Sequence, residues 1–140
     1  FLFYEAKRYD LKGKKYLANN SKYYLCDTSF RYAVNGTRNM DFGRVYENIV
    51  YLELLRRGYQ VSIGKLDLLE VDFIAQKEDK RIYYQVSATV LDEKTYEREF
   101  APLKKINDSY PKYVLTLDEF PMGEDGIEQK NIIDFLLEEN

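Results

Sequence analysis

Three side chains in the middle of the sequence, Glu47, Asp72 and Gln85, are of the types that hold the metal ion in a metal-dependent phosphodiesterase. A fourth, Ser87, stands two residues after the last of them, where such a site normally has a lysine. Carboxylate and amide oxygens are ligands that Mg²⁺ accepts in proteins, and a bound metal ion activates water for attack on a phosphodiester. The candidate metal ligands are therefore Glu47, Asp72 and Gln85, with Mg²⁺ as the cofactor, and Ser87 completes the candidate catalytic set.

A helix over residues 41–57 is predicted to position Glu47. Asp41 is a good N-cap residue, and Gly58 suits the position just after the last turn. Apolar residues recur at spacings of three and four along two stripes, which predicts burial on more than one side. Glu47 falls within the second stripe, so we expect its carboxyl to point inward.

Two alternating segments, residues 69–75 and 82–90, predict a β-hairpin with a turn at Glu78-Asp79. The register that this turn sets places Asp72 opposite Gln85, on the polar face of the hairpin. A slip of one residue would separate the two side chains.

Alternation within the first of these strands also places Val71 and Ile74 on opposite faces of the sheet. The remaining elements complete an α/β (α+β) fold with a mixed central sheet flanked by helices. We expect extended chain over 2–9, a basic turn at 12–15, strands at 22–27, 59–64 and 113–117, and helices at 27–34, 92–106 and near the C-terminal end.

The composition limits the function classes. The chain has 140 residues, of which 45% are hydrophobic and 32% charged, as suits one ordinary folded domain. It has no histidine and one cysteine, Cys26, which excludes Ser-His-Asp catalysis and multi-cysteine zinc sites. No apolar run approaches the ~18 residues of a membrane span. The ATPase phosphate-loop pattern GxxxxGK[ST] is absent from this sequence.

The charge is uneven along the chain. The net charge is −3, yet residues 1–25 hold six Lys/Arg against Glu5 and Asp10, which gives +4 there and −7 over the other 115 residues. Such asymmetry, with a first residue other than Met, leads us to expect a C-terminal piece of a larger cytoplasmic protein.

Several stretches resemble one family. GRVYENIVYLELLRRGYQVSIGKL (43–66), EVDFIA (70–75) and IYYQVS (82–87) resemble the C-terminal domain of unknown function in bacterial and archaeal AAA-type ATP-binding proteins. REFAPLKKINDSYPKYVLTLDE (98–119) is similar to the later helix and strand of that family. The family domain itself resembles the PD-(D/E)XK restriction-endonuclease-like fold.

This resemblance implies two parts, a linking segment at 1–36 that follows a missing ATPase and winged-helix-like region, and a restriction-endonuclease-like domain at 37–140. It matches Glu47 to the acid of the first helix and Asp72 to the acid of the first strand. Gln85 stands at the second acid and Ser87 at the motif lysine. Because serine is short and neutral, the resemblance implies a nuclease-like accessory domain with a vestigial site. Its implied work is binding to nucleic acid or protein, coupled to the ATPase module of the same parent.

Two other functions stay open at this point. One is an active Mg²⁺-dependent nuclease that uses Glu47, Asp72 and Gln85 with a lysine from elsewhere, such as Lys65 or Lys94. The other is a structural domain that forms homo-oligomers through its tyrosine-rich surface. The four candidate residues also have plain structural readings, as a satisfied buried acid and as ordinary polar residues of exposed strands.

Overall fold

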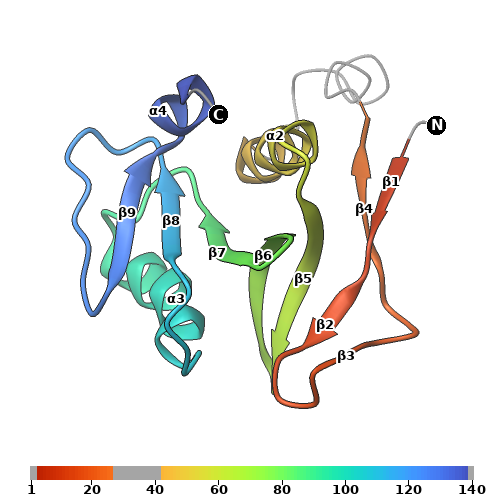
Figure 1. Ribbon diagram of the computed structural model, residues 1–140. Helices are drawn as coiled ribbons and strands as arrows, with labels where there is room; N and C mark the ends of the chain where they lie inside the picture. Colours follow the sequence, from red (N-terminus) through yellow and green to blue (C-terminus); the bar gives the residue numbers. More distant parts are fainter. Residues whose placement is uncertain (1–2, 27–41, 139–140) are drawn as a thin grey trace.

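The computed structural model describes residues 3–26 and 42–138. A mixed sheet of seven strands forms its centre, in the spatial order β3-β2-β5-β6-β7-β8-β9. A separate two-stranded antiparallel sheet joins β1 and β4 (Figure 1). The strands are β1 (Phe3–Ala6), β2 (Arg8–Asp10), β3 (Lys15–Tyr16), β4 (Lys22–Leu25), β5 (Gln60–Leu66), β6 (Leu69–Lys77), β7 (Lys80–Val86), β8 (Lys112–Thr116) and β9 (Ile127–Asn131), and the helices are α2 (Phe42–Arg56), α3 (Glu93–Lys104) and α4 (Ile132–Leu137).

Helices cover both faces of the seven-stranded sheet, which confirms the expected α/β class with a mixed sheet. α2 and α4 pack on one face, around a core that includes Leu54, Phe73 and Phe135. α3 packs on the other face, around Phe100 and Val114. Figure 1 shows α2 and α4 together near the top and α3 lower down beside β8 and β9.

The two central helices follow their sequence signals. α2 ends at Arg56, and Gly58 has a φ of +89°, the left-handed conformation that glycine adopts without penalty after a helix. The side chain of Asp92 accepts a hydrogen bond from the Thr95 amide at 3.1 Å and caps α3. Pro102 lies inside α3, whose helical conformation continues to Lys104. The Asp41 cap and the helix expected at 27–34 lie outside the described residues.

The hairpin has the predicted register at its turn, where Lys77 pairs with Lys80 and Phe73 pairs with Tyr84. Its second strand is shorter than expected. β7 ends at Val86 instead of residue 90, because at this point the side chains of Asp72 and Gln85 take the backbone amides that would bond across the hairpin. The Val90 amide donates to the carboxylate of Asp118.

A β-bulge corrects the predicted faces of β6. Ser62 pairs with Ile74 and Gly64 pairs with Val71, so one residue of β5 opposes two of β6, Asp72 and Phe73. The extra residue brings Val71 and Ile74 to the same face, in the core under α3, where simple alternation would separate them. The bulge lies at the candidate acid Asp72.

The segment before residue 27 contributes directly to the sheet. β2 pairs in parallel with β5, and β3 pairs with β2 at the edge. Tyr24 of β4 is buried against α2. The division at residues 36 and 37 falls outside the described residues and stays a prediction. No helix in the described part of the chain is long and apolar enough to cross a membrane.

Candidate functional site

Glu47 lies on the buried side of α2, one turn before the buried residues Val50 and Tyr51. Its carboxylate oxygen Oε2 accepts a hydrogen bond from the Tyr24 hydroxyl at 2.9 Å. The same oxygen forms an ion pair with the ammonium of Lys22 at 3.0 Å. Only 15% of the Glu47 side chain is exposed, so these contacts stabilise the charge in place of water. The expectation of an inward-facing carboxyl is confirmed.

Tyr24 is a fixed hydrogen-bond donor at this site. Its ring is stacked on that of Tyr51, with centroids 4.2 Å apart. Burial raises the pKa of Tyr24 well above its usual value, and the neighbouring carboxylate of Glu47 raises it further. The hydroxyl therefore stays protonated and donates to Glu47.

Asp72 lies on β6 at the bulge in the pairing of β5 with β6. Its Oδ2 atom accepts a hydrogen bond from the Val86 amide at 2.8 Å, so the carboxyl replaces a backbone partner in the ladder. Burial raises the pKa of Asp72 well above its usual value, and the charges of Glu47 and Glu99 raise it further. The hydrogen bond from Val86 and the charge of Lys22 act in the opposite direction.

Gln85 is a buried crosslink between three elements. Its amide oxygen accepts from the Asp72 backbone amide at 2.7 Å, and its amide nitrogen donates to the Glu99 carbonyl at 3.0 Å. The side chain therefore ties β7 to β6 and to α3. The structure thus brings Gln85 and Asp72 together, but the oxygen of Gln85 already has a backbone partner.

Ser87 lies just beyond the end of β7. Its hydroxyl donates to the Thr89 carbonyl at 2.9 Å, which is a local turn contact. The cation beside the acids comes instead from β4, as Lys22, and not from Lys65 or Lys94 as the sequence suggested.

Three further members of this cluster, Lys22, Tyr24 and Glu99, were not predicted from the sequence. Lys22 and Tyr24 alternate on a predicted strand, so period-two spacing was the signal that they share a face. Glu99 lies at helical spacing from Tyr96 and Leu103, on the side of α3 that faces the sheet. Burial raises the pKa of Glu99, an effect that its ion pair with Arg98 opposes.

Two of the three predicted magnesium ligands already have partners within the protein. Magnesium requires near-octahedral oxygen coordination. The amide oxygen of Gln85 is bonded to a backbone amide, and Glu47 is neutralised by Lys22. Among residues 3–26 and 42–138, no three His, Cys, Asp or Glu side chains are grouped so as to hold a metal ion.

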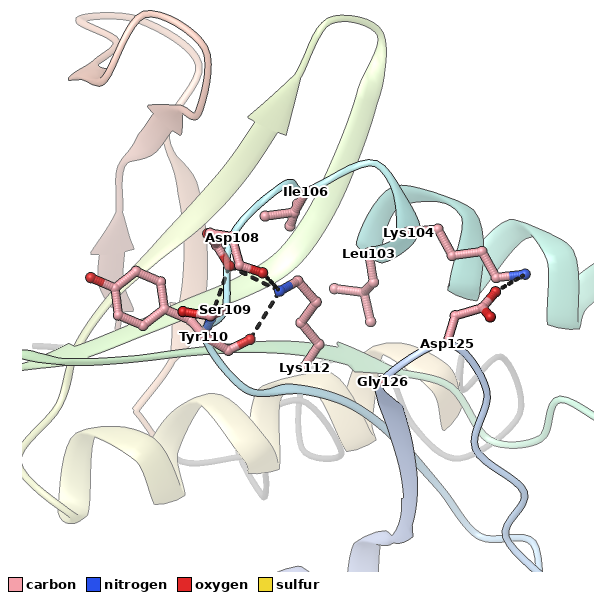
Figure 2. Close-up of a pocket in the computed structure, with 9 residues that line it drawn as sticks. All are labelled: Leu103, Lys104, Ile106, Asp108, Ser109, Tyr110, Lys112, Asp125 and Gly126. Atoms are coloured by element: carbon pink, nitrogen blue, oxygen red, sulfur yellow. Dashed lines mark hydrogen bonds and ion pairs between the residues drawn. The ribbon is translucent and has the colours of Figure 1, made fainter.

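A cavity of about 470 Å³ lies away from this cluster, beside the loop that joins α3 to β8. Figure 2 shows that its polar groups bond to one another. The ammonium of Lys112 bonds to the carboxylate of Asp108 at 2.9 Å and to the Tyr110 carbonyl at 2.9 Å (Figure 2). Lys104 forms ion pairs with Glu124 and Asp125. These contacts leave the cavity with its charges largely matched.

Comparisons with known proteins give relatives but no activity. The chain is 45% identical over 139 residues to an uncharacterized protein of Haemophilus influenzae, which covers 99% of this chain and 34% of the relative. It is 32% identical over 96 residues to an uncharacterized protein of Methanocaldococcus jannaschii, which covers 62% of this chain and 21% of that relative. No family model and no solved structure matches the chain. The chain thus spans about a third and about a fifth of the lengths of these two relatives.

Proposed function

We propose that this chain is a restriction-endonuclease-like accessory domain that has lost phosphodiester hydrolysis. It acts by binding, as the C-terminal part of an AAA-type ATP-binding protein. The order α2, β5, β6, β7, α3, β8 supports this proposal, because it carries an acid on the helix, an acid on the first hairpin strand and Gln85 on the second. The two relatives extend well beyond this chain, which accords with a module of a larger protein.

One observation supports the loss of hydrolysis above all others. The Lys22 ammonium lies 3.0 Å from Glu47 Oε2, so an internal cation already neutralises the acid that a metal ion would need. Displacement of Lys22 would leave an ammonium that is only 33% exposed without its partner. The hydroxyl at the position of the motif lysine, Ser87, bonds within its own turn.

A manganese titration together with a cleavage assay tests this proposal. We expect no saturable Mn²⁺ binding by calorimetry at millimolar metal. We also expect the same background cleavage of supercoiled plasmid for the wild type and Asp72→Asn. Cleavage by the wild type that Asp72→Asn abolishes would overturn the proposal.

The second candidate is an active Mg²⁺-dependent nuclease in which Lys22 replaces the motif lysine. Its support is that Lys22 acts on both acids, through its ion pair with Glu47 and through its charge at Asp72, and a lysine so placed can stabilise a developing phosphate charge. Lys22→Met separates the two candidates. An active enzyme would lose cleavage in this variant, whereas a vestigial site would show reduced stability and no change in nuclease background. Glu128→Gln, at an exposed position of β9, is the control variant and should match the wild type in stability and in background cleavage.

A further inference from the structure

A second cavity, of about 570 Å³, lies between the β2–β3 turn and the loop after α3. This volume falls within the range of about 300–1,000 Å³ that small-ligand sites occupy. Basic and aromatic side chains dominate its walls. They are Lys12, Lys14, Arg81, Lys105, Tyr9, Tyr83 and Tyr110, and three apolar residues, Asn107 and Asp108 complete the lining. We call this cavity the basic cleft.

The basic cleft concentrates positive charge on a protein whose net charge is −3. Lys12, Lys14, Lys105 and Arg81 contribute four cations to its walls, and Asp108 is the acid among the lining residues. Lys12 also pairs with Asp67, but both side chains are more than 60% exposed, so this ion pair holds the lysine weakly. The lysines are therefore available to an anionic ligand.

The carboxylate of Asp108 does not neutralise the four cations of the basic cleft, because it is already bonded to two other side chains. The Tyr83 hydroxyl donates to Asp108 at 2.6 Å, and the buried ammonium of Lys112 bonds to it at 2.9 Å. Burial alone would raise the pKa of Asp108, but these hydrogen bonds lower it below the usual value. Asp108 is thus ionised and paired with Lys112, on the side of the adjoining cavity (Figure 2).

Arg81 is held between two aromatic rings at the cleft. Its guanidinium carbon lies 5.3 Å from the ring centre of Tyr9 and 5.7 Å from that of Tyr110. Its Nη2 atom donates to the amide oxygen of Gln76 at 2.9 Å. These contacts fix a planar cation beside Tyr110, whose residue surface is 41% exposed and presents a ring to an incoming planar group.

The wall that carries Tyr110 is pre-organised. The ammonium of Lys112 donates to the carbonyls of Asp108 and Tyr110, and the Tyr110 amide donates to the carboxylate of Asp108. Figure 2 shows these groups converging on Lys112. A ligand would therefore meet an ordered loop, which lowers the entropy that binding must supply.

The basic cleft is separate from the cluster of carboxyl groups formed by Glu47, Asp72 and Glu99. Arg81 is the second residue of β7 and Val86, the partner of Asp72, is the last. At about 3.3 Å per residue, the two positions lie roughly 16 Å apart along the strand. Substitutions in one site therefore leave the side chains of the other in place.

We propose that the basic cleft binds the phosphate of a nucleotide, either as a free nucleotide or as one unit of a single strand of nucleic acid. Lys12, Lys14 and Lys105 contact the phosphate, and the base stacks on Tyr110. A cationic groove with an exposed aromatic ring, here that of Tyr110, is the combination that recognises such ligands without a sequence code. This inference rests on the proposed binding function and names its ligand and its location.

The test measures the fluorescence anisotropy of a labelled dT12 oligonucleotide at several salt concentrations, in EDTA so that no metal-dependent cleavage intervenes. We expect Lys12→Ala/Lys105→Ala to weaken binding at least about tenfold at low salt and to reduce the salt slope by up to about 0.7, the value for the single phosphate that these lysines contact. Lys80→Ala/Lys94→Ala removes the same charge from exposed positions outside the cleft lining and should change binding less than about twofold. Tyr110→Leu should weaken binding at least about fivefold.

Competition by AMP and by inorganic phosphate distinguishes the two sources of the ligand. AMP that displaces dT12 at a similar concentration per nucleotide indicates a free-nucleotide site, and displacement only by unlabelled oligonucleotide indicates a strand. No binding of either probe, or equal loss in both double variants, would overturn the inference. A different result would contradict the proposed loss of hydrolysis. In that case dT12 would be shortened once Mg²⁺ replaces EDTA, whether or not the basic cleft binds it.

Discussion

Asp72 should reduce the stability of the fold at neutral pH, and Asp72→Asn should restore it. The carboxyl is buried between strands and near Glu47 and Glu99, and its pKa is raised well above the usual value. The folded protein therefore keeps a proton that the unfolded chain releases above about pH 4. Stability then falls as the pH rises from that value through the folded pKa.

The size of the effect follows from the chemistry of the site. Each unit of pKa difference corresponds to about 1.4 kcal/mol. An asparagine at position 72 keeps an oxygen that can accept from the Val86 amide, and its unfolded chain has no proton to release there. We expect a gain of on the order of 1–3 kcal/mol at pH 7, the usual size of the effect of one unfavourably buried polar group. The melting temperature should rise by about 4 °C per kcal/mol.

Urea unfolding at pH 7 and at pH 3.5 measures the free energy of unfolding for the wild type, Asp72→Asn and the exposed control Glu128→Gln. The gain should be present at pH 7 and nearly absent at pH 3.5, where Asp72 is protonated in both states. The control should stay within about 0.5 kcal/mol of the wild type. If Asp72→Asn is no more stable than the wild type at pH 7, or if its gain persists at pH 3.5, the ionisation of Asp72 does not determine this part of the stability.

Three further variants test the packing around the site by urea unfolding. Arg57→Met should cost about 3 kcal/mol or more, because the Arg57 side chain is 4% exposed and donates to the Phe135 carbonyl between α2 and α4; a loss below 1 kcal/mol would contradict this role. Gln85→Leu should cost roughly 1–3 kcal/mol, since it leaves a backbone amide and a carbonyl without partners, and an unchanged midpoint would count against the crosslink. Gly64→Ala should cost about 1–3 kcal/mol, because an added Cβ would lie 3.0 Å from the Cβ of Val71; equal stability would show that the sheet yields there.

The strongly periodic elements could be predicted from the sequence. The helix that carries Glu47 and the hairpin register at Lys77 and Lys80 agree with the structure, because each has one dominant spacing and a clear boundary signal. The segment at 127–131 could not be recognised as the strand β9. It reads IEQKN, and its pairing with β8 is a tertiary effect that the polar composition does not reveal.

Of the candidate site, the sequence predicted the acidic residues Glu47 and Asp72 but not the residues that bond to them. Glu47 and Asp72 stand out because charged residues within apolar patterns need partners. The partners themselves come from distant segments, since Lys22 and Tyr24 precede α2 and Glu99 follows the hairpin. The β-bulge at Asp72 could not be predicted either. One extra residue changes which face of the sheet the following side chains occupy, and the composition of the strand gives no sign of it.

The origin of Lys22 and Tyr24 has a mechanical consequence. Both residues belong to the β1–β4 ribbon, which pairs within itself and not with the seven-stranded sheet. Separation of β4 from α2 would remove the ammonium and the phenol from Glu47 without breaking a strand pair of the main sheet. Asp72 would at the same time lose the charge of Lys22, which opposes the effect of Glu47 on its pKa, so the position of one short strand controls the electrostatics of both acids.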